Sequence, residues 1–293
     1  MKKGLTIFLI IILAIFAISL SFILYLGLNN NWNYNFNIGL NKNISDKLIF
    51  EKDYNIKEIS LKTNYAKIEI KENDTNNITL KIYSDDLDRF IINENEKLEI
   101  KDINEPCKFF CFNQKLSHII ITIPKDYNQD LTINNKYGDI YINNLPNLNV
   151  IINENAGDIN IDSINNGIIN NDLGDIIINS INDGTINCSA GDIKIKNINN
   201  ATINNNFGDI KVNNITNSFT IKNNAGDIYI DNINITKNSQ INNDLGDIKI
   251  NSTNEINIIS HTDLGNNKIN HNYPESNITL NIENNCGNIK VNN

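Results

Sequence analysis

The sequence predicts an all-β protein whose larger part is a right-handed parallel β-solenoid. Three observations support this fold class. Asn occurs 64 times and Ile 60 times among the 293 residues, which suits strands that bury Ile and expose Asn. Apolar and polar residues alternate with a period of two over many short segments. A Gly-Asp-Ile unit recurs every 17–20 residues over the second half of the chain.

Composition excludes several other classes of protein. The net charge is -9 and Arg89 is the only arginine, so the basic face that a nucleic-acid binder needs is missing. The abundance of Ile argues against a disordered chain. A helical bundle is disfavoured because Asn and Ile are both mediocre helix formers.

The N-terminus predicts a membrane anchor. Residues 5–28 form 24 consecutive residues without a charge and follow Lys2 and Lys3. A stretch of this length spans a bilayer, whereas the apolar region of a cleaved signal peptide is shorter. We favour an uncleaved transmembrane signal anchor over a cleaved signal, with residues 1–4 cytoplasmic. Residues 29–44 are interpreted as a linker, and the rest of the single-pass protein is expected outside the cell membrane.

Residues 45–130 predict an N-terminal β region. Period-two alternation marks half-buried strands at residues 66–70, 78–82, 97–100 and 119–123. Polar clusters at 71–77 and 84–88 separate them as turns would. Pro124 is expected to end the last strand because proline cannot donate to a ladder.

Residues 131–293 predict the solenoid. In each unit a Gly is followed by Asp or Asn, then by a first strand, an Asn-rich turn and a second strand. A unit of this size cannot bury its Ile face alone, so neighbouring units must stack. Gly before Asp suits a tight corner that needs a positive φ. The structural turn residues predicted in this way are Gly138, Gly157, Gly174, Gly191, Gly208, Gly226 and Gly246, with Gly265 and Gly287 in the last two units.

The residue before each of these glycines shows a finer order. Large and small residues alternate from Tyr137 through Leu245, and the rule then lapses at Leu264 and Cys286. The alternation would fill space evenly if these side chains pointed inward on adjacent coils. Alternatively, two units form one coil and like stacks on like. We prefer one unit per coil.

The residues resemble a known family. The strand 119–123 with Pro124 and Lys125, followed by Gly-Asp-Ile units behind one N-terminal apolar segment, is similar to the putative-adhesin β-strand-repeat family. This family of membrane-anchored domains of unknown function is common in Gram-positive bacteria. The resemblance covers about residues 45–293 and implies an envelope location and a β-solenoid-like fold. It carries no established catalytic residues, and Asn266 and Asn288 depart from its Asp pattern.

The repeated aspartates are the sharpest candidate for chemistry. Stacked carboxylates repel, so something must offset the repulsion. The first reading is that they cap turns in solvent by bonding backbone N–H groups. The alternative is a ladder of bound Ca²⁺, which takes six to eight oxygen ligands, although the paired glycines of calcium-binding rolls are missing. No other cofactor is expected. The ladder consists of Asp139, Asp158, Asp175, Asp192, Asp209, Asp227 and Asp247.

The cysteines leave alternatives open. Cys107 and Cys111 are close enough in sequence to pair in an exported domain, to stay free, or to chelate a metal. A zinc site would need two more ligands, and only His118 is near. Cys188 and Cys286 are interpreted as small apolar core residues.

Function is predicted less closely than architecture. His118, His261 and His271 are scattered, and no nucleophile motif appears, so no catalytic residue is assigned. The solenoid carries most of the negative charge, which disfavours anionic partners and suits a neutral envelope glycan or a protein. The chain ends directly after a strand, so its last coil could pair with another chain. We expect a non-enzymatic binding or scaffolding protein of the cell envelope, with adhesion as one such role. The alternatives are an accessory or sensor subunit in envelope-stress signalling, and a polysaccharide-active β-helix enzyme.

Overall fold

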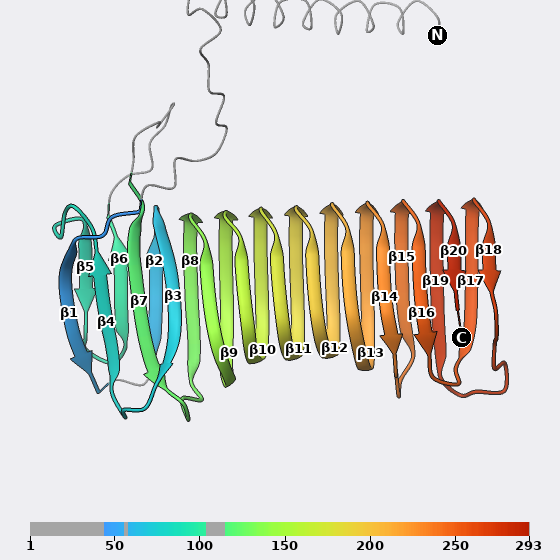
Figure 1. Ribbon diagram of the computed structural model, residues 1–293, viewed down its shortest axis with the longest axis horizontal. Coiled ribbons are helices and arrows are strands. Elements are labelled where there is room, and N and C mark those ends of the chain that lie inside the picture. Colours follow the sequence, from blue (N-terminus) through green and yellow to red (C-terminus); the bar gives the residue numbers. More distant parts are fainter. Residues whose placement is uncertain (1–43, 56–57, 104–114, 293) are drawn as a thin grey trace, which may run out of the picture. The chain divides into compact units, whose positions relative to one another are not determined.

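The computed structural model describes residues 44–55, 58–103 and 115–292. These residues form twenty strands and no helix, and they belong to the compact unit Lys42–Asn293 (Figure 1). Among them no helix is long and apolar enough to cross a membrane. The anchor expected at residues 5–28 lies outside the described residues, as do Cys107 and Cys111.

Five long strands build the regular part of the molecule. Each pairs in parallel with the next, for example with Ile159 opposite Ile176 and Ile169 opposite Ile186. One repeat therefore makes one coil. The two short strands and the turn expected within a unit are replaced by one strand that continues through a bend, since inward Ile and outward Asn alternate on both sides of it. The strands are β9 (Ile140–Ala156), β10 (Ile159–Leu173), β11 (Ile176–Ala190), β12 (Ile193–Phe207) and β13 (Ile210–Ala225).

The bend divides every coil between two faces. Face A contains the first halves of β9 to β13, and face B contains their second halves. The coils continue through strands that are separate on each face. On face A these are β14 (Ile228–Ile233), β16 (Ile248–Thr253), β20 (Ile289–Val291) and β18 (Asn267–Ile269), and on face B they are β15 (Ser239–Leu245), β19 (Thr279–Cys286) and β17 (Asn257–Leu264).

The C-terminal end breaks the sequence order. Strand β19 lies between β15 and β17, and β20 lies between β16 and β18, so the last strands of the chain are enclosed on both sides. The free edge expected at the last strand belongs instead to β17 and β18. The Asn272 side chain bonds both the N–H and the C=O of Ile258 on this edge, at 2.6 and 3.1 Å. It thereby occupies backbone groups that could pair with another chain.

The N-terminal end is also out of order. The coil made by β2 (Ile59–Thr63) and β3 (Ala66–Asn73) lies between β6–β7 and β8–β9. The two faces thus run without a break across residue 130. Three pairs here are antiparallel, namely β1–β4, β4–β7 and β5–β6. The remaining strands are β1 (Leu48–Tyr54), β4 (Ile78–Tyr83), β5 (Phe90–Asn93), β6 (Leu98–Asp102), β7 (Ser117–Pro124) and β8 (Asp130–Tyr137).

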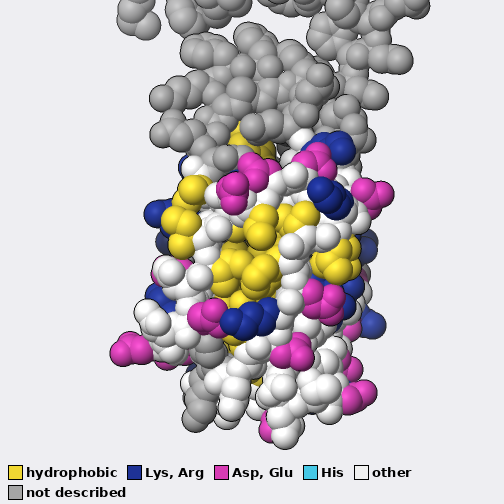
Figure 2. Space-filling view, turned by 90° about the vertical axis from the view of Figure 1, so that its left-hand side faces the viewer, with side chains coloured by type: hydrophobic (Ala, Val, Ile, Leu, Met, Phe, Trp, Pro, Cys, Tyr) yellow, Lys and Arg dark blue, Asp and Glu magenta, His cyan; other side chains and the backbone are white. Residues whose placement is uncertain are grey.

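The core is a continuous column of aliphatic side chains between the faces. In β12, for example, Ile193, Ile195, Ile198 and Ile203 are all buried. Each such side chain stabilises the fold by about 1.5–3 kcal/mol relative to leaving it exposed. At the N-terminal end the column comes near the surface, where Leu48 and Ile91 are partly exposed. Figure 2 shows this end, with apolar side chains at its centre and charged ones around them.

Candidate functional site

One corner of every coil is built on the predicted glycine. A Cβ at any of the nine positions would lie 2.0–2.3 Å from the backbone oxygen stacked before it. Gly208 also has a φ of +130°, which side chains rarely adopt. At Gly157 no such φ occurs. A Cβ at Gly157 would still lie 2.2 Å from the carbonyl oxygen of Gly138, and this contact alone excludes a side chain. Glycine is required here mainly because the corners stack so closely.

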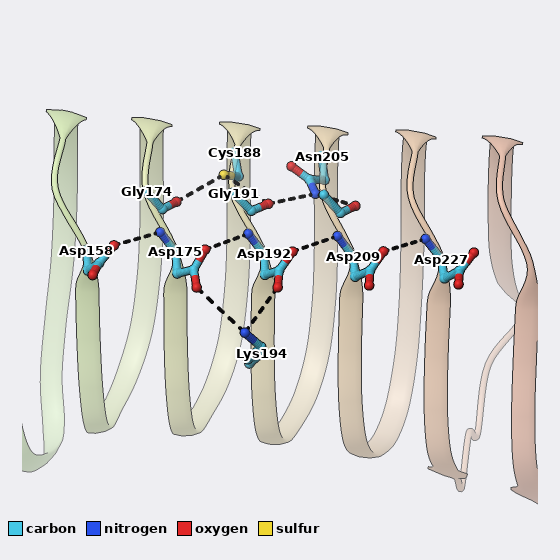
Figure 3. A network of polar contacts seen from close by, with 11 residues as sticks. Asp158, Gly174, Asp175, Cys188, Gly191, Asp192, Lys194, Asn205, Asp209 and Asp227 are labelled. Atoms are coloured by element: carbon cyan, nitrogen blue, oxygen red, sulfur yellow. Dashed lines mark hydrogen bonds and ion pairs between the residues drawn. The ribbon is translucent and has the colours of Figure 1, made fainter. Parts of the chain in front are cut away.

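The aspartate after each glycine joins its coil to the next. Oδ1 of Asp175 accepts a hydrogen bond from the backbone N–H of Asp192 at 2.9 Å, and Oδ1 of Asp192 accepts one from Asp209 at 3.0 Å (Figure 3). The same bond recurs from Asp139 to Asp247 and continues through Asn288 to Asn266. Asn serves there because its side-chain oxygen accepts equally well.

The second carboxylate oxygens of this ladder face outward. Lys194 Nζ lies 3.1 Å from Asp192 Oδ2 and 3.6 Å from Asp175 Oδ2 (Figure 3). The Asp209 amide and Lys194 lower the pKa of Asp192. Tyr229 donates to Asp227 Oδ2 at 2.7 Å. Within the described ranges, no group of three or more His, Cys, Asp or Glu side chains is placed to hold a metal ion.

A second polar ladder lies inside the same corner, three residues before each glycine. Asn205 Nδ2 donates to the carbonyls of Gly191 and Gly208, at 3.1 and 3.0 Å. Cys188 takes the equivalent place in its coil and contacts the carbonyls of Gly174 and Gly191 (Figure 3). Glu154 holds this position in another coil and is also buried. Its pKa is raised to about 8, mainly because burial disfavours the charged form.

The residue before each glycine points outward, so the expectation that these side chains interdigitate in the core is wrong. Leu173, Phe207 and Leu264 are 57, 65 and 70% exposed. Cys286 is also exposed rather than a core residue, whereas Cys188 is buried as expected. Leu173 directly precedes the corner, where the period-two alternation of the strand ends. We call Ala156, Leu173, Ala190, Phe207, Ala225, Leu245, Cys286 and Leu264 the corner row.

A groove runs along face B near the opposite bend. Its volume is about 570 Å³ and its lining comes from seven successive coils, a length of about 29 Å. Gly167, Gly184 and Ala201 lie in the middle of its lining, and a Cβ at either glycine would point to core Ile side chains and away from the groove. One wall carries Ile151, Ile168, Thr185, Thr202 and Thr220, and the other carries Asp130, Asn149, Asn166, Asp183, Asn200 and Ser218.

The side-chain hydrogen bonds along the wall that carries Asp130 and Asp183 are interrupted between Asn166 and Asp183. Asn149 donates to Asp130, and Asn166 donates to Asn149 at 3.0 Å. Asp183 stands opposite Asn166 and offers only acceptors when ionised. Its Oδ1 accepts from Asn200, and its Oδ2 accepts from Asn182 at 3.4 Å. Asn166 Oδ1 is buried, and no donor of the described residues reaches it. Asp183 therefore offers its remaining lone pairs in the middle of the groove and suits a ligand that supplies hydrogen-bond donors.

The histidines do not come together with these features. His118 lies on β7 beside Glu69, at 2.9 Å, and His261 bonds Asp263 on the exposed β17. Burial opposes ionisation of Glu69, yet Lys67, Lys71 and His118 lower the pKa of its carboxyl to about 2. The groove was not found from the sequence, where outward Thr and Asn positions give no signal of their own. The alternation of size in the corner row was found from the sequence, but its side chains were expected in the core and lie on the surface.

The family model described as Toastrack DUF4097 matches residues 56–292. The chain belongs to this family. Its expected resemblance to a family of β-strand-repeat domains is thereby confirmed. No curated protein matches the Toastrack chain.

Several solved structures are similar to this Toastrack protein, each over 84% of the chain. A putative cell adhesion protein from Clostridium sporogenes is 14% identical, covered over 99% of its length, with a TM-score of 0.29. A putative adhesin from Bacteroides fragilis is 18% identical, covered over 97%, with a TM-score of 0.37. A putative lipid binding protein from Parabacteroides distasonis is 14% identical, covered over 98%, with a TM-score of 0.43.

Proposed function

We propose that this Toastrack protein is a non-enzymatic binding or scaffolding protein of the cell envelope, held at the membrane by residues 5–28. The observation that carries the proposal is the groove on face B. It is continuous over seven coils and has small residues in the middle of its lining. An extended groove of this kind suits a chain-like ligand more than a compact one.

The chemistry of the groove favours a neutral, hydroxyl-rich polymer. Among the described residues that line it, none is Lys or Arg, and Asp130 and Asp183 would repel an anion. The remaining lone pairs of Asp183 suit hydrogen-bond donors, which sugar hydroxyls supply. The Thr and Ile side chains on the other wall can contact the less polar faces of sugar rings. A neutral envelope glycan meets all three conditions.

The same groove argues against hydrolysis of that glycan. Asp130 and Asp183 are three coils apart, a separation of about 14 Å. Glycosidase carboxyl pairs are about 5–5.5 Å apart in retaining enzymes and about 6.5–9.5 Å apart in inverting ones. The two carboxylates are therefore too far apart to flank one glycosidic bond.

Binding of neutral polysaccharides to the full chain tests the proposal. Thr185→Trp places a large ring in the middle of the groove, and we expect it to weaken glycan binding at least tenfold in a pull-down with immobilised cell-wall glycan. The matched control is Asn179→Trp on the outer side of face A. Equal binding by both variants would contradict the role of the groove. Capture of membrane signalling proteins by the full chain, with no glycan, would favour the signalling alternative.

A further inference from the structure

We propose that the corner row is a self-association surface on which two copies of this chain pair in antiparallel orientation. The row runs along the edge of the molecule where the arrowheads of β9 to β13 lie (Figure 1). The inference concerns a different surface from the groove and does not depend on its ligand.

The order of the row in space is more regular than its order in sequence. In sequence order the row ends with Leu245, Leu264 and Cys286, which breaks the alternation of large and small residues. Because β19 is enclosed between β15 and β17, Cys286 lies between the two leucines. The alternation then continues without a lapse through all eight coils. The repeat alone does not explain an alternation that survives the rearrangement of the last coils. The alternation points to a use of the row as a whole.

The row has the shape of a surface that fits itself. Its large side chains are more than half exposed and stand on every second coil, about 10 Å apart, with Ala or Cys between them. Two antiparallel rows can place each large side chain opposite a small one. The two-fold axis then passes between Phe207 and Ala225. The facing pairs are Phe207 with Ala225, Ala190 with Leu245, Leu173 with Cys286, and Ala156 with Leu264.

At the two ends of the row, charge favours this register. In the middle, Asp192 faces Asp247 and Asp209 faces Asp227, each with an outward Lys or Tyr two residues later. On face A beside the row, the N-terminal coils carry Asp158 and Asp175 without a lysine at the neighbouring outward position. The last two coils carry Asn in place of Asp and add Lys290 and Lys268. Antiparallel pairing brings these lysines opposite the two aspartates. The replacement of Asp by Asn at positions 266 and 288 leaves these two coils without the ladder carboxylate beside their lysines. The turn itself does not require this replacement, because Asn288 accepts the same hydrogen bond as the aspartates.

The other flank of the row also tolerates the pairing. It carries Asp172, Asp244 and Asp263 on face B. In the same register these residues face Asn285, Ser189 and Asn155, so on this flank no two carboxylates oppose one another. Tyr137 precedes the row but is stacked on Tyr65, with ring centroids 5.0 Å apart, and stays outside the pairing.

The size of the row predicts a weak pair. Eight coils extend over about 38 Å, and the edge between two packed sheets is about 10 Å wide. Such a strip is at the low end of interface sizes, so pairing needs a high local concentration. Covalent trapping is therefore a better measurement than the mass in dilute solution.

Disulfide trapping of the full chain in its membrane tests the register. In a Cys107→Ser, Cys111→Ser background, Leu173→Cys should give a covalent dimer on mild oxidation, because residue 173 faces Cys286 of the second copy. The dimer should be lost with Cys286→Ser. The control is Leu245→Cys. The Leu245 side chain is 55% exposed, but position 245 stands opposite Cys286 of its own chain. This variant should stay monomeric, and equal dimer yields from the two variants would overturn the proposal.

A charge exchange gives an independent test. Lys268→Glu with Lys290→Glu should lower the dimer yield about tenfold, and adding Asn160→Lys with Ile177→Lys should restore it. All variants should unfold at the temperature of the parent chain, which excludes misfolding as the cause. In a second experiment, Leu173→Cys is treated with a thiol reagent in the presence of phospholipid vesicles. If this variant forms no covalent dimer and the vesicles protect its thiol, the proposal is overturned and the row is assigned to lipid binding.

Discussion

Glu154 stands at an inward position that Asn fills in most other coils. It is 2% exposed, and its Oε1 accepts a hydrogen bond from the Ala156 N–H at 3.2 Å. Asn at this position carries no charge and adds two donors for the corner carbonyls. A carboxyl group can match this neutrality only when protonated. The raised pKa of about 8 follows from burial at this one coil.

The stability of the folded chain should therefore fall with rising pH through this residue. The unfolded chain releases the proton near pH 4.5, whereas the folded chain keeps it up to about pH 8. The stabilisation is fully present below pH 4.5 and is lost as the pH rises to about 8. Relative to Glu154→Gln, we expect the free energy of unfolding to drop by up to about 1.4 kcal/mol per pH unit over this window.

Urea unfolding at several pH values measures this difference. Glu283→Gln on β19 is the matched control, because Glu283 is exposed and its replacement should leave the pH dependence of the parent chain in place. Parallel pH profiles for the parent chain and Glu154→Gln would show that Glu154 titrates as an ordinary carboxyl.

At the scale of an element, the aspartate ladder shows how each coil corner is held to the next. Oδ1 of Asp209 accepts from the Asp227 N–H at 2.8 Å, and Asn288 accepts from Asn266 N–H at 3.0 Å by the same geometry. The bond needs an oxygen at the right place and does not need a charge. This is the contribution of a capping side chain, repeated on successive coils.

Replacement of one ladder residue should separate the oxygen from the charge. Asp209→Ala should destabilise the chain by about 1 kcal/mol, whereas Asp209→Asn should stay within about 0.5 kcal/mol. Asp172→Ala is the control, since this exposed carboxylate has no side-chain partner among the described residues. The free energy of unfolding in urea gives all three values. A large loss for Asp209→Asn would mean that the charge itself is needed.

At the scale of the whole molecule, both ends of the solenoid are closed by strands that return out of sequence order. β2–β3 at one end and β19–β20 at the other lie between coils formed by other parts of the chain. A terminal coil in sequence order would leave a bare edge, a hazard for pairing with other chains. Here β17 carries the edge, and Asn272 covers part of it.

Two truncations test this arrangement. A chain ending at Ser276 keeps β17 and β18 but removes β19 and β20, the strands with which they pair. We expect residues 257–269 to exchange their amide hydrogens at unfolded rates, while β12 stays protected as in a chain that ends at Thr253. The full chain should protect all of these strands. Protection of β17 in the longer truncation would show that it can pair directly with β15.

The fold class was predictable because its signals are local. Period-two alternation marked strands that are present at β3, β4, β6 and β7, and Pro124 ends β7 as expected. The spacing of Gly-Asp-Ile gave the parallel register between coils. Parts of the site could not be predicted from the sequence. Outward Leu173 and Phe207 were assigned to the core, because the sequence does not show that the corner ends the alternation.

The sequence by itself determined that Ile lines a stacked β core and that Gly and Asp form its corners, since each depends on residues within one repeat. The tertiary structure alone decided which coils are neighbours at the two ends and, through them, the regular order of the corner row. These depend on pairings between residues far apart in the chain. Such pairings are chosen by the total burial and hydrogen bonding of both faces, and no local spacing encodes them.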